Sequence, residues 1–272
     1  MSLERAISKA GAASRVEARA WVAAGRVKVG GRIVRDPRRR VDPARDRILL
    51  DGRPLPARRP IYLALHKPKG TVTTRRDERG RRTVYDLLPA GTPHVVPIGR
   101  LDLDTSGLLL LTNDTAFAHE LASPDYHVPK TYQVKASSRL AEEALDRLRA
   151  GPALRDGPTR PAAVERLRDP GGRTVFTITI TEGRNRQVRR MVEAVGAKVR
   201  TLARIAIGPL SLGALPAGAS RPLTASELAA LRRTIAAGPR RRPRGAAQSR
   251  SRSRRPARSY CCGMRSSGRW KA

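Results

Sequence analysis

Residues 97–107 read Pro97-Ile98-Gly99-Arg100-Leu101-Asp102-Leu103-Asp104-Thr105-Ser106-Gly107, and the apolar run Leu108 to Leu111 and then Thr112-Asn113-Asp114 follow. Two glycines bracket a short loop with one arginine and two carboxylates. The apolar run is typical of a short buried strand, and the Asn-Asp pair marks a turn or a helix cap. We expect such a loop to hold the chemistry of the protein.

The acids of this loop have two interpretations. Most aspartates are solvated, and Asp102 and Asp104 would then simply balance nearby arginines. However, Asp102 lies between Leu101 and Leu103 and follows Arg100. Flanking apolar side chains and a neighbouring cation favour a positioned, charged carboxylate at Asp102.

The composition indicates a polyanionic partner. The chain has 272 residues, 39% of them hydrophobic, and a formal net charge of +33 from 56 Lys and Arg against 23 Asp and Glu. This content supports a core in one or two domains, and the charge far exceeds what solubility requires. No apolar run approaches the length of a membrane span, and the amino terminus lacks the apolar region of a signal peptide. We therefore expect nucleic acid as the partner, no membrane association and a cytoplasmic location.

Cysteine and histidine usage indicates neither disulfides nor a metal. Cys261 and Cys262 are adjacent, so they cannot staple the fold, which fits a reducing compartment. The four histidines show no ligand spacing, and we expect no metal.

The first fifty residues predict a small basic module. Residues 3–11 and 14–25 have helical patterns, and Ser14 with Glu17 forms a capping box at the start of the second helix. Two alternating segments around Gly30-Gly31 predict a hairpin. Basic residues that we expect to face RNA are scattered through these elements: Arg15, Arg19, Arg26, Lys28 and Arg32.

Residues 51–60 hold three prolines and predict a linker, and residues 61–236 alternate strands with a few helices. The expected strands are 61–65, 71–74, 130–135, 173–181 and 199–215. The expected helices are 115–122, capped by Asn113 or Asp114, one capped by Ser137 or Ser138 and ended by Gly151, one that starts at Asn185, and one that starts with a Thr224 and Glu227 capping box. The absence of a regular βαβ repeat predicts an α+β domain on a mainly antiparallel sheet. Residues 237–272 are basic and poor in apolar residues, and we expect a disordered tail.

The helix that starts at Asn185 carries an apolar stripe of Val188, Met191, Val192 and Val195. At about 100° per residue, Arg189 falls on the border of that stripe, whereas Arg186 and Arg190 project away from it. We therefore expect Arg189 to reach into a cleft.

Several of these motifs resemble a known family. Gly-Arg-Leu-Asp followed by Thr-Ser-Gly-Leu-Leu-Leu-Leu-Thr-Asn-Asp is similar to the active-site motif of the RsuA/RluB-type ribosomal pseudouridine synthases. Lys67-Pro68-Lys69-Gly70 resembles their entry into the catalytic domain, and residues 130–134 and 182–191 supply two further motifs in the family's order. Gly-Arg-Val-Lys-Val-Gly-Gly-Arg in residues 25–32 resembles the S4 RNA-binding domain. The resemblance covers residues 1–236.

The resemblance implies roles for particular residues. It implies that Asp102 is the catalytic aspartate, Tyr132 the active-site tyrosine and Arg189 the basic residue that pairs with Asp102. It also implies isomerisation of a uridine already in ribosomal RNA, without a cofactor. A guanidinium about 4 Å from the carboxylate contributes roughly 4 kcal/mol of gross attraction at an effective dielectric near 20. Further residues that we expect to contact RNA are Lys67, Lys69, Arg100 and Arg184.

Several interpretations of the substrate and function fit the sequence. We interpret the substrate as large-subunit ribosomal RNA, either free or in a pre-ribosomal particle, and small-subunit ribosomal RNA is the nearest alternative. We expect the protein to act as a monomer. A non-catalytic S4-type RNA-binding or ribosome-assembly protein would fit the charge equally well, but it gives no reason for the Asp102, Tyr132 and Arg189 motifs to coexist. An RRM-like reader is disfavoured because aromatic residues make up only 3% of the chain. A basic protein of membrane surfaces would need an amphipathic anchor helix.

Overall fold

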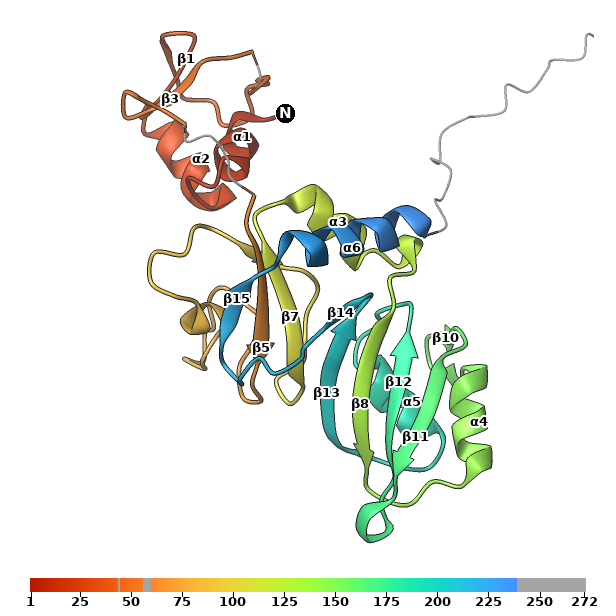
Figure 1. Cartoon of the computed structure of the whole chain (residues 1–272). Coiled ribbons are helices and arrows are strands. Elements are labelled where there is room, and N and C mark those ends of the chain that lie inside the picture. Colours follow the sequence, from red (N-terminus) through yellow and green to blue (C-terminus); the bar gives the residue numbers. More distant parts are fainter. Residues whose placement is uncertain (44, 56–59, 239–272) are drawn as a thin grey trace, which may run out of the picture. The chain divides into compact units, whose positions relative to one another are not determined.

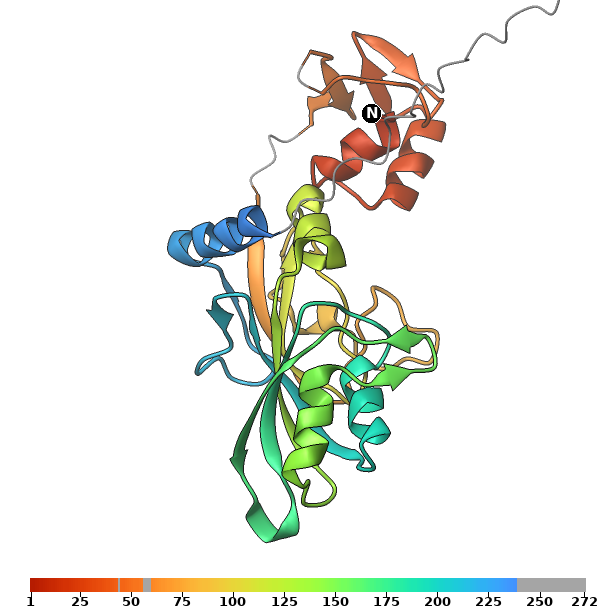
Figure 2. The same cartoon turned by 90° about the vertical axis from the view of Figure 1, so that its right-hand side faces the viewer.

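The computed structural model describes residues 1–43, 45–55 and 60–238. Figures 1 and 2 show the chain in two perpendicular views. The expected tail falls outside the described residues apart from its first two positions, of which Ala237 ends the last helix. Cys261 and Cys262 also lie outside them.

The S4-like module, residues 1–55, packs two helices against a four-stranded sheet. Its helices are α1 (Leu3–Lys9) and α2 (Arg15–Ala23), and its strands, in sheet order, are β2 (Arg32–Val34), β1 (Val27–Val29), β3 (Ile48–Leu50) and β4 (Arg53–Pro54). The capping box of Ser14 and Glu17 is confirmed. Gly30 and Gly31 both adopt positive φ, at 57° and 83°, which a two-residue hairpin turn requires. Leu3, Ile7 and Val22 lie in its core.

The expected linker begins too early. Arg53–Pro54 pairs with β3 as strand β4, and the Leu55 amide donates to the Ile48 carbonyl. Asp51 and Gly52 form the turn of this hairpin, both at positive φ. The prolines suggested a linker, but Pro54 is tolerated because it lies on an edge strand.

Residues 60–238 build one mixed sheet. Along the sheet the strands are β11 (Ala163–Arg168), β12 (Val175–Ile180), β8 (Lys130–Ala136), β13 (Val199–Ile207), β7 (Ser106–Thr112), β5 (Tyr62–Lys67) and β15 (Ser220–Pro222), with β14 (Leu210–Ser211) on β13 and β6 (Val96–Pro97) on β7. The described pairings of this sheet are antiparallel except that of β7 with β13. The expected α+β class with a mainly antiparallel sheet is therefore confirmed.

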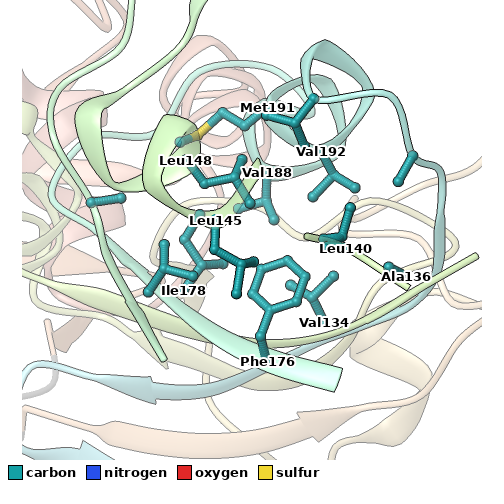
Figure 3. Close-up of a cluster of buried hydrophobic side chains, with 14 of the residues drawn as sticks. Val134, Ala136, Leu140, Leu145, Leu148, Phe176, Ile178, Val188, Met191 and Val192 are labelled. Carbon is teal, nitrogen blue, oxygen red and sulfur yellow. The ribbon is translucent and has the colours of Figure 1, made fainter. Parts of the chain in front are cut away.

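The helices cover both faces of the sheet. They are α3 (Thr115–Ala122), α4 (Glu142–Ala150), α5 (Gln187–Ala194) and α6 (Ala225–Ala237). The smaller elements are the 3-10 turns η1 (Val84–Leu87), η2 (Pro124–Tyr126) and η3 (Pro170–Gly172) and the hairpin of β9 (Ala153–Leu154) and β10 (Gly157–Pro158). Helices α4 and α5 lie over the β11-β12-β8-β13 end (Figure 2). Figure 3 shows Leu145 and Leu148 of α4 and Val188 and Met191 of α5 in one apolar cluster with Phe176 of β12.

The apolar run in β7 has partners on both faces. Leu108 and Leu110 pack with α3 and α6, whereas Leu109 and Leu111 pack with Val84 and Leu101 on the other face. A strand covered on both sides has no solvated face, which explains why the sequence reads as a continuous apolar run.

Two expected helix caps are wrong. We expected Ser137 or Ser138 to cap helix α4, but the helix begins after Ala141. The Ser137 hydroxyl instead accepts a hydrogen bond from the Lys198 amide, just before β13. Helix α5 begins after Arg186, which has a left-handed φ of 48°, so Asn185 lies one residue outside the cap. The Asp114 cap of α3 and the Thr224 and Glu227 capping box are confirmed.

Gly107, the second residue of β7, lies very close to the backbone of the neighbouring strand β13. Its φ is +111°, and a Cβ there would lie 2.2 Å from the Arg204 carbonyl oxygen. We expect Gly107→Ala to lower the free energy of unfolding by at least about 2 kcal/mol, since backbone must move. Urea unfolding checks this, with Gly183→Ala as control, because its Cβ would meet nothing within 4 Å. Equal free energies of unfolding for the two variants would contradict the close approach of Gly107 to the backbone of Arg204.

Candidate active site

The loop between β6 and β7, residues 98–105, is fixed through its backbone. The Thr73 hydroxyl donates to the Leu101 carbonyl at 2.9 Å, and the Gly70 amide donates to the Leu103 carbonyl at 2.8 Å. The Thr105 amide donates to the Asp102 carbonyl at 3.1 Å, which closes a turn around the acids. Asp102 thus projects from a loop that is held at three points.

Arg189, a buried residue of α5, also holds this loop. It is only 6% exposed, and its Nη2 donates to the Asp104 carbonyl at 3.1 Å and to the Thr105 hydroxyl at 3.3 Å. The same nitrogen lies 3.0 Å from the Asp104 carboxylate. The expected pairing of Arg189 with Asp102 is therefore replaced by a pairing with Asp104. We expected Arg189 to reach into a cleft, but it contacts Asp104 and Thr105 of the loop and is not among the residues that line the cleft described below.

Within the described residues, the cation that forms an ion pair with Asp102 is Arg186, which the helical projection placed away from the site. Its Nη1 lies 3.9 Å from the Asp102 carboxylate and 3.5 Å from that of Asp104. The helical projection does not apply to Arg186, because this residue has a positive φ and precedes the first residue of α5. The Asp102 side chain is 33% exposed, so a substrate can reach it.

Asp102 and Tyr132 line one cleft of about 620 Å³. Its walls come from residues 98–105, from residues 183–188 and from the face of β8 and β13 that carries Tyr132. This volume falls within the range of about 300–1,000 Å³ that small-molecule sites show, and it admits one nucleotide. The structure thus brings together two of the three residues expected at the site, Asp102 and Tyr132, whereas Arg189 contacts the loop and does not line the cleft.

Lys67 lies beneath the loop. It is fully buried, and its Nζ donates to the carbonyls of Thr105 at 2.8 Å and Pro68 at 3.1 Å. Burial lowers its pKa from 10.5 to about 8, while Asp102 and Asp104 oppose that shift. The structure places Lys67 as a support of the loop and away from the surface where we expected it to meet RNA.

The shifted pKa of Lys67 makes stability depend on pH. In the unfolded chain the lysine keeps its proton up to about pH 10.5, whereas the folded protein loses it near pH 8. Because the unfolded state then binds more protons, this group makes the free energy of unfolding rise with pH across that window. We expect the free energy of unfolding of wild type, measured by denaturant titration, to rise relative to that of Lys67→Met from pH 8 to 10. A difference in free energy that does not change with pH would contradict the lowered pKa of Lys67.

Arg184 and Arg190 fasten the β9-β10 hairpin to the start of α5. Arg184 donates to the carbonyls of Asp156, Gly157 and Pro158, and Arg190 forms a two-point ion pair with the Asp156 carboxylate. Arg184 also lines the cleft, but its guanidinium is engaged with protein backbone. The structure therefore gives it a structural role where we expected a contact with RNA.

The other residues expected to contact RNA lie at the surface. Arg100 and Lys69 are exposed, and Arg100 lines the cleft. In the S4-like module, Arg15 and Arg19 pair with buried Glu4 yet keep side chains 65% and 61% exposed. Arg26 pairs with Asp51, and Lys28 and Arg32 are exposed with no ion pair among the described residues.

Three cations that the sequence analysis did not single out also line the cleft: Arg81, Lys130 and Arg204. Lys130 and Arg204 lie in strands, where a basic residue among apolar neighbours was the available signal. In the described part of the chain, no cluster of three His, Cys, Asp or Glu side chains offers a metal site. None of the helices described is long and apolar enough to cross a membrane.

Comparison with known proteins agrees with this geometry. Residues 61–194 match the RNA pseudouridylate synthase family, and residues 1–48 match the S4 domain. An uncharacterized RNA pseudouridine synthase of Bacillus subtilis is 41% identical over 84% of this chain and 97% of its own length. The ribosomal large subunit pseudouridine synthase B of the same organism is 41% identical over 85% of this chain and 95% of its own. A crystal structure of a pseudouridylate synthase aligns with a TM-score of 0.62 and 33% identity, covering 85% of this chain and 99% of that one. The chain belongs to the RNA pseudouridine synthase family and carries its S4 domain at the amino terminus.

Proposed function

We propose that the protein isomerises one uridine of large-subunit ribosomal RNA, with Asp102 as the carboxylate that acts on the ribose. One observation carries this proposal: Asp102 and Tyr132 line the same cleft, which is large enough for one nucleotide. Asp102 lies on a loop that is held by buried Arg189, and Tyr132 lies in β8. The similarity to ribosomal large subunit pseudouridine synthase B supports the choice of subunit.

The reaction needs only rearrangement of bonds. The glycosidic bond between C1′ and N1 breaks, the base turns, and C5 bonds to C1′. The proton leaves C5 and N1 gains one, so nothing is oxidised and no atom is lost. Asp102 acts at C1′ or its neighbouring proton, Tyr132 stacks against the uracil, and Arg189 keeps the loop in position.

The uridine must leave its helix to reach the cleft, which costs a few kcal/mol. Basic residues recover this through phosphate contacts, and the net charge of +33 makes such contacts plentiful. We propose that the exposed cations of the S4 domain supply affinity for ribosomal RNA, free or in an assembling particle in the cytoplasm, while residues 61–236 of a monomer supply the chemistry.

Lys28 and Arg32 test this division of roles. Removal of one cation that neutralises a phosphate reduces the log-log salt slope of binding by about 0.7 to 0.9. Replacing both by alanine should therefore make the slope shallower by up to about 1.8, with turnover at saturating RNA preserved. Exposed Arg168 and Arg233, which form no ion pair in the described structure, supply the matched control double variant. Equal slopes for the two double variants would contradict a role of this surface.

The subunit assignment is tested by mapping pseudouridine in ribosomal RNA from cells with and without the gene. We expect one site of the large-subunit RNA to disappear and to return with wild type but not with Asp102→Asn. Loss of a small-subunit site would overturn the subunit assignment. Loss of no site would favour a non-catalytic RNA-binding protein.

A further inference from the structure

Two cations lie beside Tyr132 on the floor of the cleft. Lys130 and Tyr132 are two residues apart in β8, so their side chains share a face of the sheet. Arg204 of β13 is directly opposite Tyr132 in the antiparallel register. Lys130, Tyr132 and Arg204 therefore form one continuous surface, and all three line the cleft.

Arg204 is buried without a counter-ion. It is 3% exposed, and its Nε donates to the Leu108 carbonyl at 2.8 Å. Its Nη2 is buried and has no acceptor among the described residues. A guanidinium in such a position is costly unless an anion compensates it. No ion pair with a carboxylate is found for Arg204 in the described part of the chain.

Lys130 adds a second positive charge to this surface. Its Nζ donates to the Val128 carbonyl at 3.1 Å, and it too forms no ion pair within the described residues. Burial, and then the charge of Arg204, lowers its pKa to about 8, so the ammonium is still the main form at pH 7. Two like charges side by side in a partly buried wall indicate a site for negatively charged oxygen atoms.

The proposed reaction generates such oxygens in the cleft. When the C1′ to N1 bond breaks, its electron pair leaves with the base, while C1′ either bonds to the Asp102 carboxylate or gains a double bond as that carboxylate takes the C2′ proton. The detached uracil is then an anion whose charge is spread over N1, C5 and its two carbonyl oxygens. The charge disappears after C5 has bonded to C1′ and the C5 proton has been replaced by one on N1.

We propose that Lys130 and Arg204 form an anion subsite for the carbonyl oxygens of the detached uracil and hold the base while it turns beside Tyr132. This inference rests on the proposed function. Donors aimed at charge that develops only during the reaction accelerate turnover without tightening the binding of the substrate. A backbone phosphate in the same subsite would have the opposite signature, because its charge is present before and after the reaction.

The test compares turnover with affinity. The variants are Lys130→Met, Lys130→Arg and Arg204→Met, and Lys135→Met is the control, since Lys135 lies in the same strand on the opposite face and does not line the cleft. We measure kcat and KM on ribosomal RNA, and we measure Kd for each change in an Asp102→Asn background, where the reaction is blocked.

We expect Lys130→Met to reduce kcat about 100-fold, with KM and Kd within about twofold of wild type. Lys130→Arg should recover most of that loss, and Lys135→Met should match wild type. Arg204→Met should lose turnover in the same way, and thermal melting separates this loss from unfolding. Lys130 is less buried than Arg204, so its variants keep the test decisive if Arg204→Met does not fold.

Two outcomes would overturn the inference. A rise in KM and Kd with unchanged kcat would assign the cations to a backbone phosphate, and unchanged kcat and KM in Lys130→Met would remove them from the reaction. Both outcomes require an active wild type. A wild-type protein that forms no pseudouridine would instead refute the proposed function itself.

Discussion

Asp102→Asn is expected to reduce pseudouridine formation by at least about 10³-fold, while affinity for RNA stays within about twofold. The asparagine keeps the shape of the side chain and removes the charge that the reaction needs. The main-chain anchors of the loop, from Thr73, Gly70 and Thr105, do not involve this carboxylate, so the loop should keep its conformation. Single-turnover rates and filter-binding affinities measured on the same RNA check both parts.

Asp104→Asn is the matched control. Its carboxylate is 49% exposed and pairs with Arg189 and Arg186, so it serves the loop. The ion pair to buried Arg189 leads us to expect a loss of about tenfold, far smaller than that of Asp102→Asn. Similar modest losses in both variants would contradict the assignment of Asp102.

Arg189→Ala is expected to lower kcat about 100-fold. Its guanidinium fixes the Asp104 carbonyl and the Thr105 hydroxyl, and both lie within three residues of Asp102. Displacement of a reacting group by about 1 Å costs on the order of 100-fold in rate. Since Arg189 acts through the loop, we expect KM to change little. Steady-state kinetics with melting curves separate this effect from unfolding.

Arg190→Ala is the control for this change. Arg190 neighbours Arg189 in the helix, but it pairs with Asp156 on the β9-β10 hairpin. We expect it to keep turnover within about threefold and to lose roughly 0.2–1 kcal/mol of stability, as exposed ion pairs do. An inactive Arg190→Ala beside a normal Arg189→Ala would refute the geometry of the site.

Local signals in the sequence predicted most elements of the fold. The Ser14 and Thr224 capping boxes and the Gly30-Gly31 hairpin depend on residues a few positions apart, so the sequence alone carries them. The apolar run at Leu108 to Leu111 likewise predicted a buried strand. The parallel pairing of β7 with β13 joins residues almost a hundred positions apart, and no local pattern could reveal it.

Contacts of long range also decided where sequence reasoning about the site failed. The helical projection indicated that Arg189 would face inward. It could predict neither the pairing with Asp104 nor the position of Arg189 outside the cleft, because both depend on the fold of the loop. Arg186 was misplaced because its positive φ removes it from the helix. The sequence around Lys67 is typical of a polar turn, whereas Lys67 is the last residue of β5 and is buried by the loop that packs over it.

The proposed conversion of uridine to pseudouridine in the cleft of Asp102 and Tyr132 can be measured with purified protein. The protein and, in parallel, Asp102→Asn are incubated with unmodified large-subunit ribosomal RNA, the RNA is digested to nucleosides, and pseudouridine is quantified by chromatography. We expect wild type to form up to one pseudouridine per RNA molecule and the variant to form none. RNA that is bound tightly by wild type but contains no pseudouridine, or equal amounts from both proteins, would contradict the proposed conversion.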